Sequence, residues 1–352
     1  MSIFFKAPID IEILLDGEES RNHIEVSNPS GSNAKTLTES MPVFEDGETV
    51  SGIATLRVRD GKRVEHAGIK VSIVGSIDLI KGSGGSNGGT TTSNSFKSVD
   101  SRKKSVEQFL CLTYDLCPAG ELQHSQSFPF NFKNLPKRHE SYKGKNVDVS
   151  YYVKVTLIRK GADISKIKKF WVNLYLSQKE IENLNKKPVA IREEANKTRE
   201  EITKPNAEEE SLISNESKPV KLDIGIENCL HIEFEYAKSA YSLKDVIVGR
   251  IYFLLSRLKI KHMEVSLITR ESAGVSSAST LVDSTAIRYE IMDGSPVKGE
   301  TIPIRLFLSG YELTPNMGCN YFNVKNYLSL VIIDEDGRRY FKQSEITLYR
   351  QK

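Results

Sequence analysis

VDVSYYVKVTLIRK, residues 147–160, is the stretch of sequence that decides the fold class. Apolar side chains occupy every second position, and polar side chains stand between them. The apolar positions are Val147, Val149, Tyr151, Val153, Val155 and Leu157. A period of two is typical of an antiparallel strand with one face buried and one face in water.

The same alternation recurs in both halves of the chain, in GIKVSIVGSIDLI (68–80), CLHIEFEY (229–236) and TIPIRLFLSG (301–310). Asp-Gly pairs punctuate these runs and are strong turn signals. They stand at residues 46–47, 60–61, 293–294 and 336–337. No convincing helical period appears outside the charged middle of the chain. The sequence therefore predicts an all-β protein built from β-sandwiches.

Two stretches interrupt the strand pattern. Lys81–Ser105 is rich in Gly, Ser and Thr, and we interpret it as a flexible insert at a hairpin tip. Gln178–Lys221 is rich in Lys, Glu and Asn, and we interpret it as a mobile linker with one short helix around Arg192–Ile202. The expected domains are therefore residues 1–177 and 222–352, joined by the linker 178–221.

The two halves of the chain contain similar sequence segments. TVSGIATLRV (49–58) in the first half resembles DVIVGRIYFLL (245–255) in the second. Each is followed by a basic residue and a histidine, His66 or His262, before a strand that reads KVSIV or EVSLI. Two matches in the same order at similar spacing indicate duplicated sandwiches in tandem.

Composition excludes several classes of protein. The chain has 352 residues and a formal net charge of +3, which is too weak for a nucleic-acid-binding protein. No run of about 18 apolar residues could span a membrane, and the first residues lack the basic start of a signal peptide. The four cysteines form no metal-binding pair, which favours free thiols in a reducing compartment.

Motifs for chemistry are missing as well. GSGGSNGG (82–89) lacks the Lys-Ser/Thr of a phosphate-binding loop, no Gly-x-Ser-x-Gly occurs, and the six histidines show no zinc-ligand spacing. We therefore expect a binding protein with no cofactor, no metal and no catalysis. A hydrolase or metal enzyme with an unrecognised site is the disfavoured alternative, because a catalytic site needs clustered titratable groups.

Three features are candidates for binding. Ile287, Tyr289 and Ile291 would share one strand face and Met292 the other, so Ile291 or Met292 should be exposed, unless both fold under their own loop. Leu222 and Ile224 would open an edge strand able to accept a peptide, although ordinary burial at an edge is the simpler interpretation. The third feature is a basic set beside Phe341, which usually is a solvated hairpin face: Arg338, Arg339 and Lys342.

The motifs also resemble a known family. AGELQHSQSFPFNFKNLPKRHESYKGKNVDVSYYVKVTLIRK (119–160) resembles the amino-terminal half of the arrestin clan. IENCLHIEFEYAKSAYSLKDVIVGRIYFLL (226–255) and YEIMDGSPVKGETIPIRLFLSGY (289–311) are similar to the arrestin-like subunit of retromer, the vacuolar protein sorting-associated 26 family. The likeness covers nearly the whole chain and implies two arrestin-like β-sandwiches.

The resemblance also implies a function. A member of this family is a non-catalytic core subunit of the retromer coat on the cytosolic face of endosomes, and it reaches the membrane only through the coat. It docks on the α-solenoid subunit, of the vacuolar protein sorting 35 family, and helps to sort transmembrane cargo in retrograde transport to the Golgi. The docking loop would be Ile291, Met292, Asp293, Gly294, Ser295, Pro296 and Val297. A groove shared with phosphoinositide-binding sorting nexins, for the tails of cargo receptors, would use Leu222, Ile224 and Phe341.

A second hypothesis is an arrestin-related adaptor that binds phosphorylated receptor tails. Such an adaptor needs a cluster of basic side chains on the concave face of its first domain. The candidates in this sequence are Arg57, Arg59, Lys62 and Arg63, although they are also typical of a solvated hairpin face. The insert 81–105 and the linker 178–221 are longer than the family leads us to expect, and the loop near Asn316–Asn320 is shorter.

Overall fold

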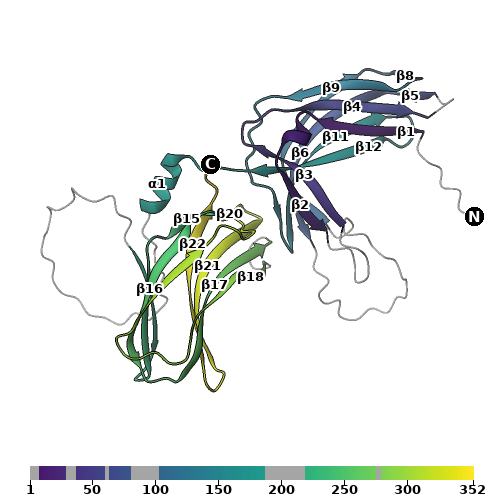
Figure 1. Ribbon diagram of the computed structural model, residues 1–352. Helices are drawn as coiled ribbons and strands as arrows, with labels where there is room; N and C mark the ends of the chain where they lie inside the picture. The colour runs from purple at the N-terminus through teal and green to yellow at the C-terminus, as the bar shows by residue number, and fades with distance from the viewer. Residues whose placement is uncertain (1–7, 29–36, 60–62, 81–102, 187–218, 275–278) are drawn as a thin grey trace, which may run out of the picture. The chain divides into compact units, whose positions relative to one another are not determined.

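A computed structural model describes residues 8–28, 37–59, 63–80, 103–186, 219–274 and 279–352 (Figure 1). Strands dominate these residues, and their only helical elements are α1 (Gln178–Lys186) and a 3-10 turn at Glu18–Ser20. The predicted all-β class is confirmed. The helix expected around Arg192–Ile202 lies outside the described residues, as does most of the insert expected at 81–105. The last three residues of that insert, Lys103–Ser105, begin a strand instead.

The chain divides into two compact units. Unit 1 comprises Met1–Tyr175 with two later segments, Glu271–Val282 and Met317–Asn323. Unit 2 comprises Leu176–Arg270, Asp283–Asn316 and Val324–Lys352.

Unit 1 contains a three-stranded and a seven-stranded sheet. The smaller sheet has the order β1 (Ile9–Leu15), β4 (Val50–Val58), β9 (Gln126–Phe132), and its strands are antiparallel. The larger sheet has the order β2 (His23–Asn28), β3 (Leu37–Glu45), β12 (Ile164–Asn173), β11 (Val147–Ile158), β6 (Gly68–Ile80), β7 (Lys103–Cys117), and β10 (Tyr142–Lys143) also pairs with β11. A separate two-stranded antiparallel sheet pairs β5 (Val64–His66) with β8 (Gly120–Leu122).

The core of unit 1 follows from the period-two pattern. The apolar residues of β11 are buried, as predicted, and they pack with residues of β6 such as Val71 and Ile73. Asp148 departs from the pattern, because it is buried although it was expected on the polar face. The Nζ atoms of Lys103 and Lys143 donate hydrogen bonds to its Oδ2 at 2.6 and 2.7 Å. These bonds replace the water that the carboxylate loses on burial.

Unit 2 has the same kind of architecture. Its four-stranded sheet has the order β13 (Val220–Ile226), β14 (Leu230–Tyr236), β16 (Val246–Ser256), β19 (Thr301–Phe307). A six-stranded sheet, most of whose residues belong to unit 2, has the order β15 (Ala240–Ser242), β22 (Arg339–Tyr349), β21 (Phe322–Asp334), β17 (Ile260–Ala273), β18 (Thr280–Asp293), and β20 (Met317–Gly318) pairs with β21. The predicted inward residues of β14, Ile232 and Phe234, are fully buried between the two sheets.

One glycine in each unit allows two strands to approach closely. A Cβ atom on Gly52 of β4 would lie 2.1 Å from the carbonyl oxygen of Leu14. A Cβ atom on Gly249 of β16 would lie 2.5 Å from the carbonyl oxygen of Glu235 and 2.9 Å from the ring of Phe234. These two glycines belong to the two segments with similar sequences, 49–58 and 245–255. The similarity therefore includes the close packing of a glycine against the adjacent strand.

The segment expected to be a linker is partly structured. Ser177 and Glu180 have the Ser-x-x-Glu spacing of a capping box at the start of α1, and the backbone N–H and the hydroxyl of Ser177 both donate to Oε2 of Glu180. Ile181 of this helix is buried against Ala240 and Tyr349 of unit 2. At its other end the predicted linker overlaps β13 by two residues, since that strand begins at Val220. The sequence signal was weak because α1 carries few apolar residues.

Candidate protein-docking site

The predicted docking loop, residues 291–297, comprises the end of β18 and the first part of the connection 294–300 to β19, and this connection is held to the neighbouring strands by backbone hydrogen bonds. The N–H of Gly294 donates to the carbonyl of Lys261 on β17, and the N–H of Gly299 donates to the carbonyl of Phe253 on β16, each at 2.7 Å. Both glycines have a positive φ, 86° and 88°, which side chains other than glycine rarely adopt. The connection is therefore fixed at both of its ends.

Ser295 adds a third attachment. Its Oγ accepts a hydrogen bond from the N–H of Ile260 at 2.7 Å and donates one to the carbonyl of the same residue at 3.1 Å. Ile260 is the first residue of β17, so this one hydroxyl satisfies both backbone groups at the start of that strand. These two bonds attach the loop to a strand that begins 35 residues earlier in the sequence.

Val297 stands out at the tip of the docking loop. Pro296 is buried, but 70% of the surface of Val297 is exposed, the largest fraction among the large hydrophobic side chains of the described residues. The N–H of Val297 donates to Oε2 of Glu300, which supports the tip from within the loop. An apolar side chain held out on a fixed loop is suited to insertion into an apolar pocket of another protein.

The structure places Ile291 and Met292 differently from the expectation. Both are half-buried and pack in part against the core of unit 2, so neither is fully exposed and neither is sealed inside. Tyr289 is exposed, although it was predicted to share a face with buried Ile287. Strict alternation does not hold along β18, since the neighbouring residues Ala286 and Ile287, and also Ile291 and Met292, contact the core.

The three residues expected to form a cargo groove are not alike in exposure. Leu222 and Ile224 are 7% and 6% exposed and belong to the core of unit 2, whereas Phe341 is 63% exposed. β13 does lie at the edge of its sheet, as predicted for an edge strand. The edge therefore presents backbone N–H and C=O groups to a ligand, because the side chains of Leu222 and Ile224 point inward.

The basic residues proposed for a phosphorylated tail do not form a cluster of free cations. Arg57 forms an ion pair with Glu12 on the adjacent strand of the three-stranded sheet. Nε of Arg63 lies 3.9 Å from Oε1 of Glu121. Lys62 lies outside the described residues, and Arg59 is exposed. The described residues therefore give no support to a phosphate site built on this set.

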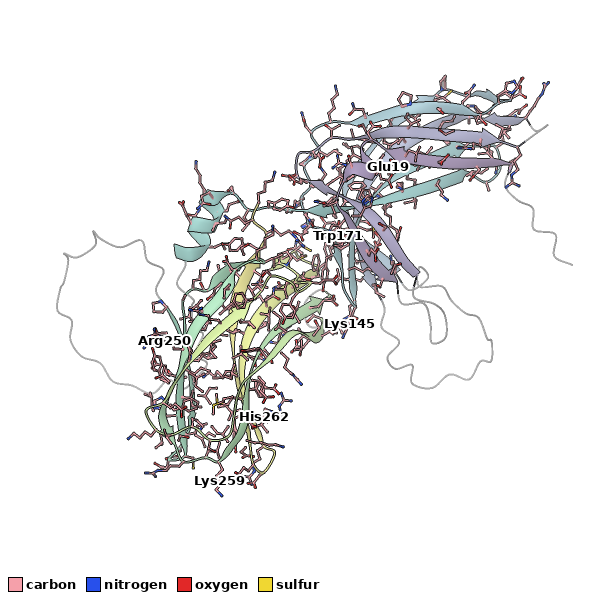
Figure 2. The ribbon with its side chains drawn as sticks, in the orientation of Figure 1. Glu19, Lys145, Trp171, Arg250, Lys259 and His262 are labelled. Atoms are coloured by element: carbon pink, nitrogen blue, oxygen red, sulfur yellow. The ribbon has the colours of Figure 1, made fainter. Side chains whose placement is uncertain are left out.

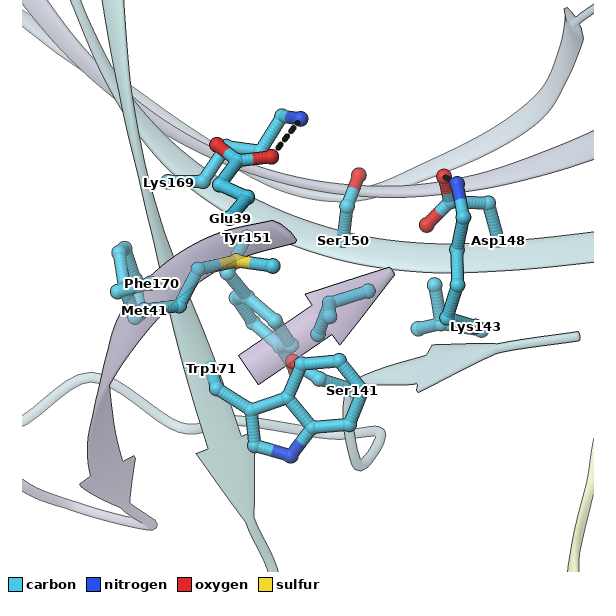
Figure 3. Close-up of a pocket in the computed structure, with 12 residues that line it drawn as sticks. Glu39, Met41, Ser141, Lys143, Asp148, Ser150, Tyr151, Lys169, Phe170 and Trp171 are labelled. Carbon is cyan, nitrogen blue, oxygen red and sulfur yellow. Dashed lines mark hydrogen bonds and ion pairs between the residues drawn. The ribbon is translucent and has the colours of Figure 1, made fainter. Parts of the chain in front are cut away.

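Unit 1 contains a small cavity beside Trp171 (Figure 3), with a volume of about 20 Å³. That volume is enough for one water molecule. The charged groups that line it are paired with each other, Lys143 with Asp148 and Lys169 with Glu39. Among the described residues, no group of three or more His, Cys, Asp or Glu side chains could hold a metal ion. The cavity is therefore too small and too neutral to serve as a substrate site.

Ser295 and Val297 were both predicted to lie in the docking loop, but the sequence does not reveal what each residue does there. The hydroxyl of Ser295 faces a strand that is distant in sequence, so its role could not be deduced from local pattern. The exposure of Val297 had a usable signal, since an apolar residue directly after Asp-Gly-Ser-Pro stands where a turn normally carries polar residues.

Comparison with known proteins gives a consistent result. The family model described as vacuolar protein sorting-associated protein 26 matches residues 5–337. The chain is 64% identical to carboxypeptidase Y-deficient protein 8 of Saccharomyces cerevisiae over the full length of both chains. It is 38% identical to vacuolar protein sorting-associated protein 26 of Schizosaccharomyces pombe, over all of this chain and 99% of that protein. It is 39% identical to the human protein 26B, over all of this chain and 88% of that protein. No helix among the described residues is long and apolar enough to cross a bilayer.

Proposed function

The chain belongs to the vacuolar protein sorting-associated protein 26 family, and from that membership we propose that it is a core subunit of the retromer coat that docks on the α-solenoid subunit through residues 291–297. Its general role is protein sorting, and the prediction that it is not an enzyme is confirmed by the family. In the proposed coat it sits on the cytosolic face of endosomes and helps to return transmembrane cargo to the Golgi.

The observation that carries the docking proposal is the exposed Val297 on a loop fixed at three points. Burying a valine side chain contributes about 1.5–3 kcal/mol. Because the loop is already ordered, little of that gain is lost to ordering it during binding. Ile291 and Met292 support the proposal as half-buried residues next to the tip, where a partner would cover the part of them that remains in water.

A role in recognition of cargo tails with a sorting nexin is the second part of the proposal. Its support is the edge position of β13 and the exposure of Phe341. An edge strand can take up an extended peptide through its backbone, and an aromatic side chain can hold an apolar residue of that peptide.

The docking proposal is tested by measuring the affinity of the purified chain for the purified α-solenoid subunit. Val297→Asp should weaken binding by roughly thirtyfold or more, the effect of losing a hot spot of about 2 kcal/mol. The melting temperature should not change, since the side chain is exposed. Ile291→Asp combined with Met292→Asn should also abolish binding, but it alters residues that contact the core and needs a check of folding.

Phe307→Asp is the matched control, because Phe307 is an exposed apolar residue at the last position of β19, away from the docking loop. This variant should bind as the unaltered chain does. If folded Val297→Asp and folded Ile291→Asp/Met292→Asn both bind with full affinity, docking through this loop is wrong.

A further inference from the structure

Glu264 is a buried carboxylate on the outer face of the six-stranded sheet of unit 2. Its neighbours on β17, Met263 and Val265, point into the core and are fully buried. Since side chains alternate along a strand, Glu264 points to the opposite face, together with His262, which Figure 2 labels. Only 9% of the surface of Glu264 is exposed.

Glu264 is the exception among the buried carboxylates of the described residues, because it accepts no hydrogen bond. Its Oε2 is buried and has no hydrogen-bond partner. The four other buried carboxylates each accept at least one: Glu140, Asp148, Glu271 and Asp334. A buried acceptor that lacks a donor costs free energy, so its persistence calls for a reason.

Two side chains lie within ion-pair distance of Glu264 but donate no hydrogen bond to it. Nε2 of His262 lies 3.4 Å from Oε1, and Nε of Arg288 lies 3.4 Å from Oε2. Arg288 is itself largely in water, with 60% of its side chain exposed. The ion pair with Arg288 offsets part of the charge. Since Oε2 is buried, another donor reaches it only when the largely exposed side chain of Arg288 moves aside.

Glu264 and the docking loop share two strands. Gly294 of the loop bonds to Lys261, which directly precedes His262 on β17. Arg288 stands on β18, the strand that continues through Ile291 and Met292 into the loop. A protein that covers the loop and extends along these strands therefore reaches Glu264.

We propose that Glu264 is a second contact of the docking surface and receives an arginine side chain from the partner that covers the loop. This inference rests on the proposed function. Arginine is the residue that fits, because its guanidinium donates paired hydrogen bonds to a carboxylate and is weakly hydrated, so it tolerates burial. Such a contact fixes the orientation of the partner, which one apolar side chain cannot do.

The test is Glu264→Gln in the full chain, titrated against the purified α-solenoid subunit at low and at high salt. Loss of a charged hydrogen bond should weaken binding about tenfold or more and reduce the dependence of affinity on salt. The melting temperature should stay the same or rise, because the substitution removes a buried charge that has no hydrogen bond. Glu290→Gln, an exposed glutamate on β18, is the control for general charge and should change affinity little.

If Glu264→Gln lowers the melting temperature but leaves the affinity unchanged, Glu264 serves only its ion pairs within the chain, and the inference is wrong. Equal losses in Glu264→Gln and Glu290→Gln would also overturn it, since they would indicate only long-range charge. Arg288→Ala is a second variant that avoids the buried site. It removes a competing cation and should bind at least as tightly, so a loss of binding would contradict the inference. If Val297→Asp loses binding while Glu264→Gln keeps it, the docking proposal stands and only this inference fails.

Discussion

The close approach of strands at Gly249 gives a stability prediction with a defined magnitude. In Gly249→Ala the new Cβ would lie 2.5 Å from the carbonyl oxygen of Glu235 and 3.1 Å from Cβ of Tyr236. Real Cβ atoms do not come that close to backbone, so β14 and β16 would have to separate. Overpacking of this kind costs about 1–3 kcal/mol. At about 2–4 °C per kcal/mol for a unit of this size, the melting temperature should fall by about 2–12 °C.

Gly225→Ala is the matched control in the same sheet, because nothing lies within 4 Å of the position that its Cβ would take. That substitution should leave stability unchanged or raise it slightly by restricting the unfolded chain. The assay is thermal unfolding followed in two ways. The single tryptophan, Trp171, lies in unit 1 and reports that unit by fluorescence, whereas circular dichroism reports both units. Equal transitions for Gly249→Ala and Gly225→Ala would refute the reasoning.

Two further predictions concern a buried charge and the docking loop. Burial opposes the ionisation of Asp148, but the hydrogen bonds from Lys103 and Lys143 outweigh it and hold the pKa of this carboxyl below its ordinary value. Its contribution to stability is therefore present above about pH 4, the ordinary pKa of aspartate, and is lost as the pH falls further. Asp148→Asn should lower the denaturation midpoint at neutral pH and flatten the acid dependence seen by Trp171 fluorescence, and an unchanged acid dependence would contradict this. Ser295→Ala should weaken binding to the α-solenoid subunit by roughly two- to tenfold in a calorimetric titration, because the loop loses two hydrogen bonds. An unchanged affinity would show that the loop keeps its conformation without them.

The sequence was sufficient for the fold class because burial in a sandwich imposes a local rule. Alternate residues of β11 and β14 face the core, and that period is visible without knowledge of any partner strand. Elements that depend on distant partners were missed. Helix α1 is held by one buried isoleucine against strands far along the chain, and Asp148 is buried only because two lysines from other strands meet it.

The docking loop shows the same limit at finer scale. Its position was predictable from Asp-Gly and from the resemblance to a family, but the exposure of each side chain was not. Ile291 and Met292 are consecutive, yet both pack in part against the core, which strict alternation along β18 does not predict. Glu264 could be noticed as an acid within an apolar run. Whether its carboxylate is satisfied depends on the geometry of residues that contact it through space.

Because α1 belongs to unit 2, an insertion between α1 and β13 differs in effect from an insertion at a border between the units. Both α1 and β13 belong to unit 2, so residues 187–218 connect two elements of one unit. Tyr175 and Leu176 mark the first covalent crossing between the units, and the chain crosses again after residues 270, 282, 316 and 323. Added length between α1 and β13 therefore changes a connection within unit 2 and costs about 0.6 kcal/mol for each doubling of that connection. An insertion after Tyr175 would instead act on a connection between the units.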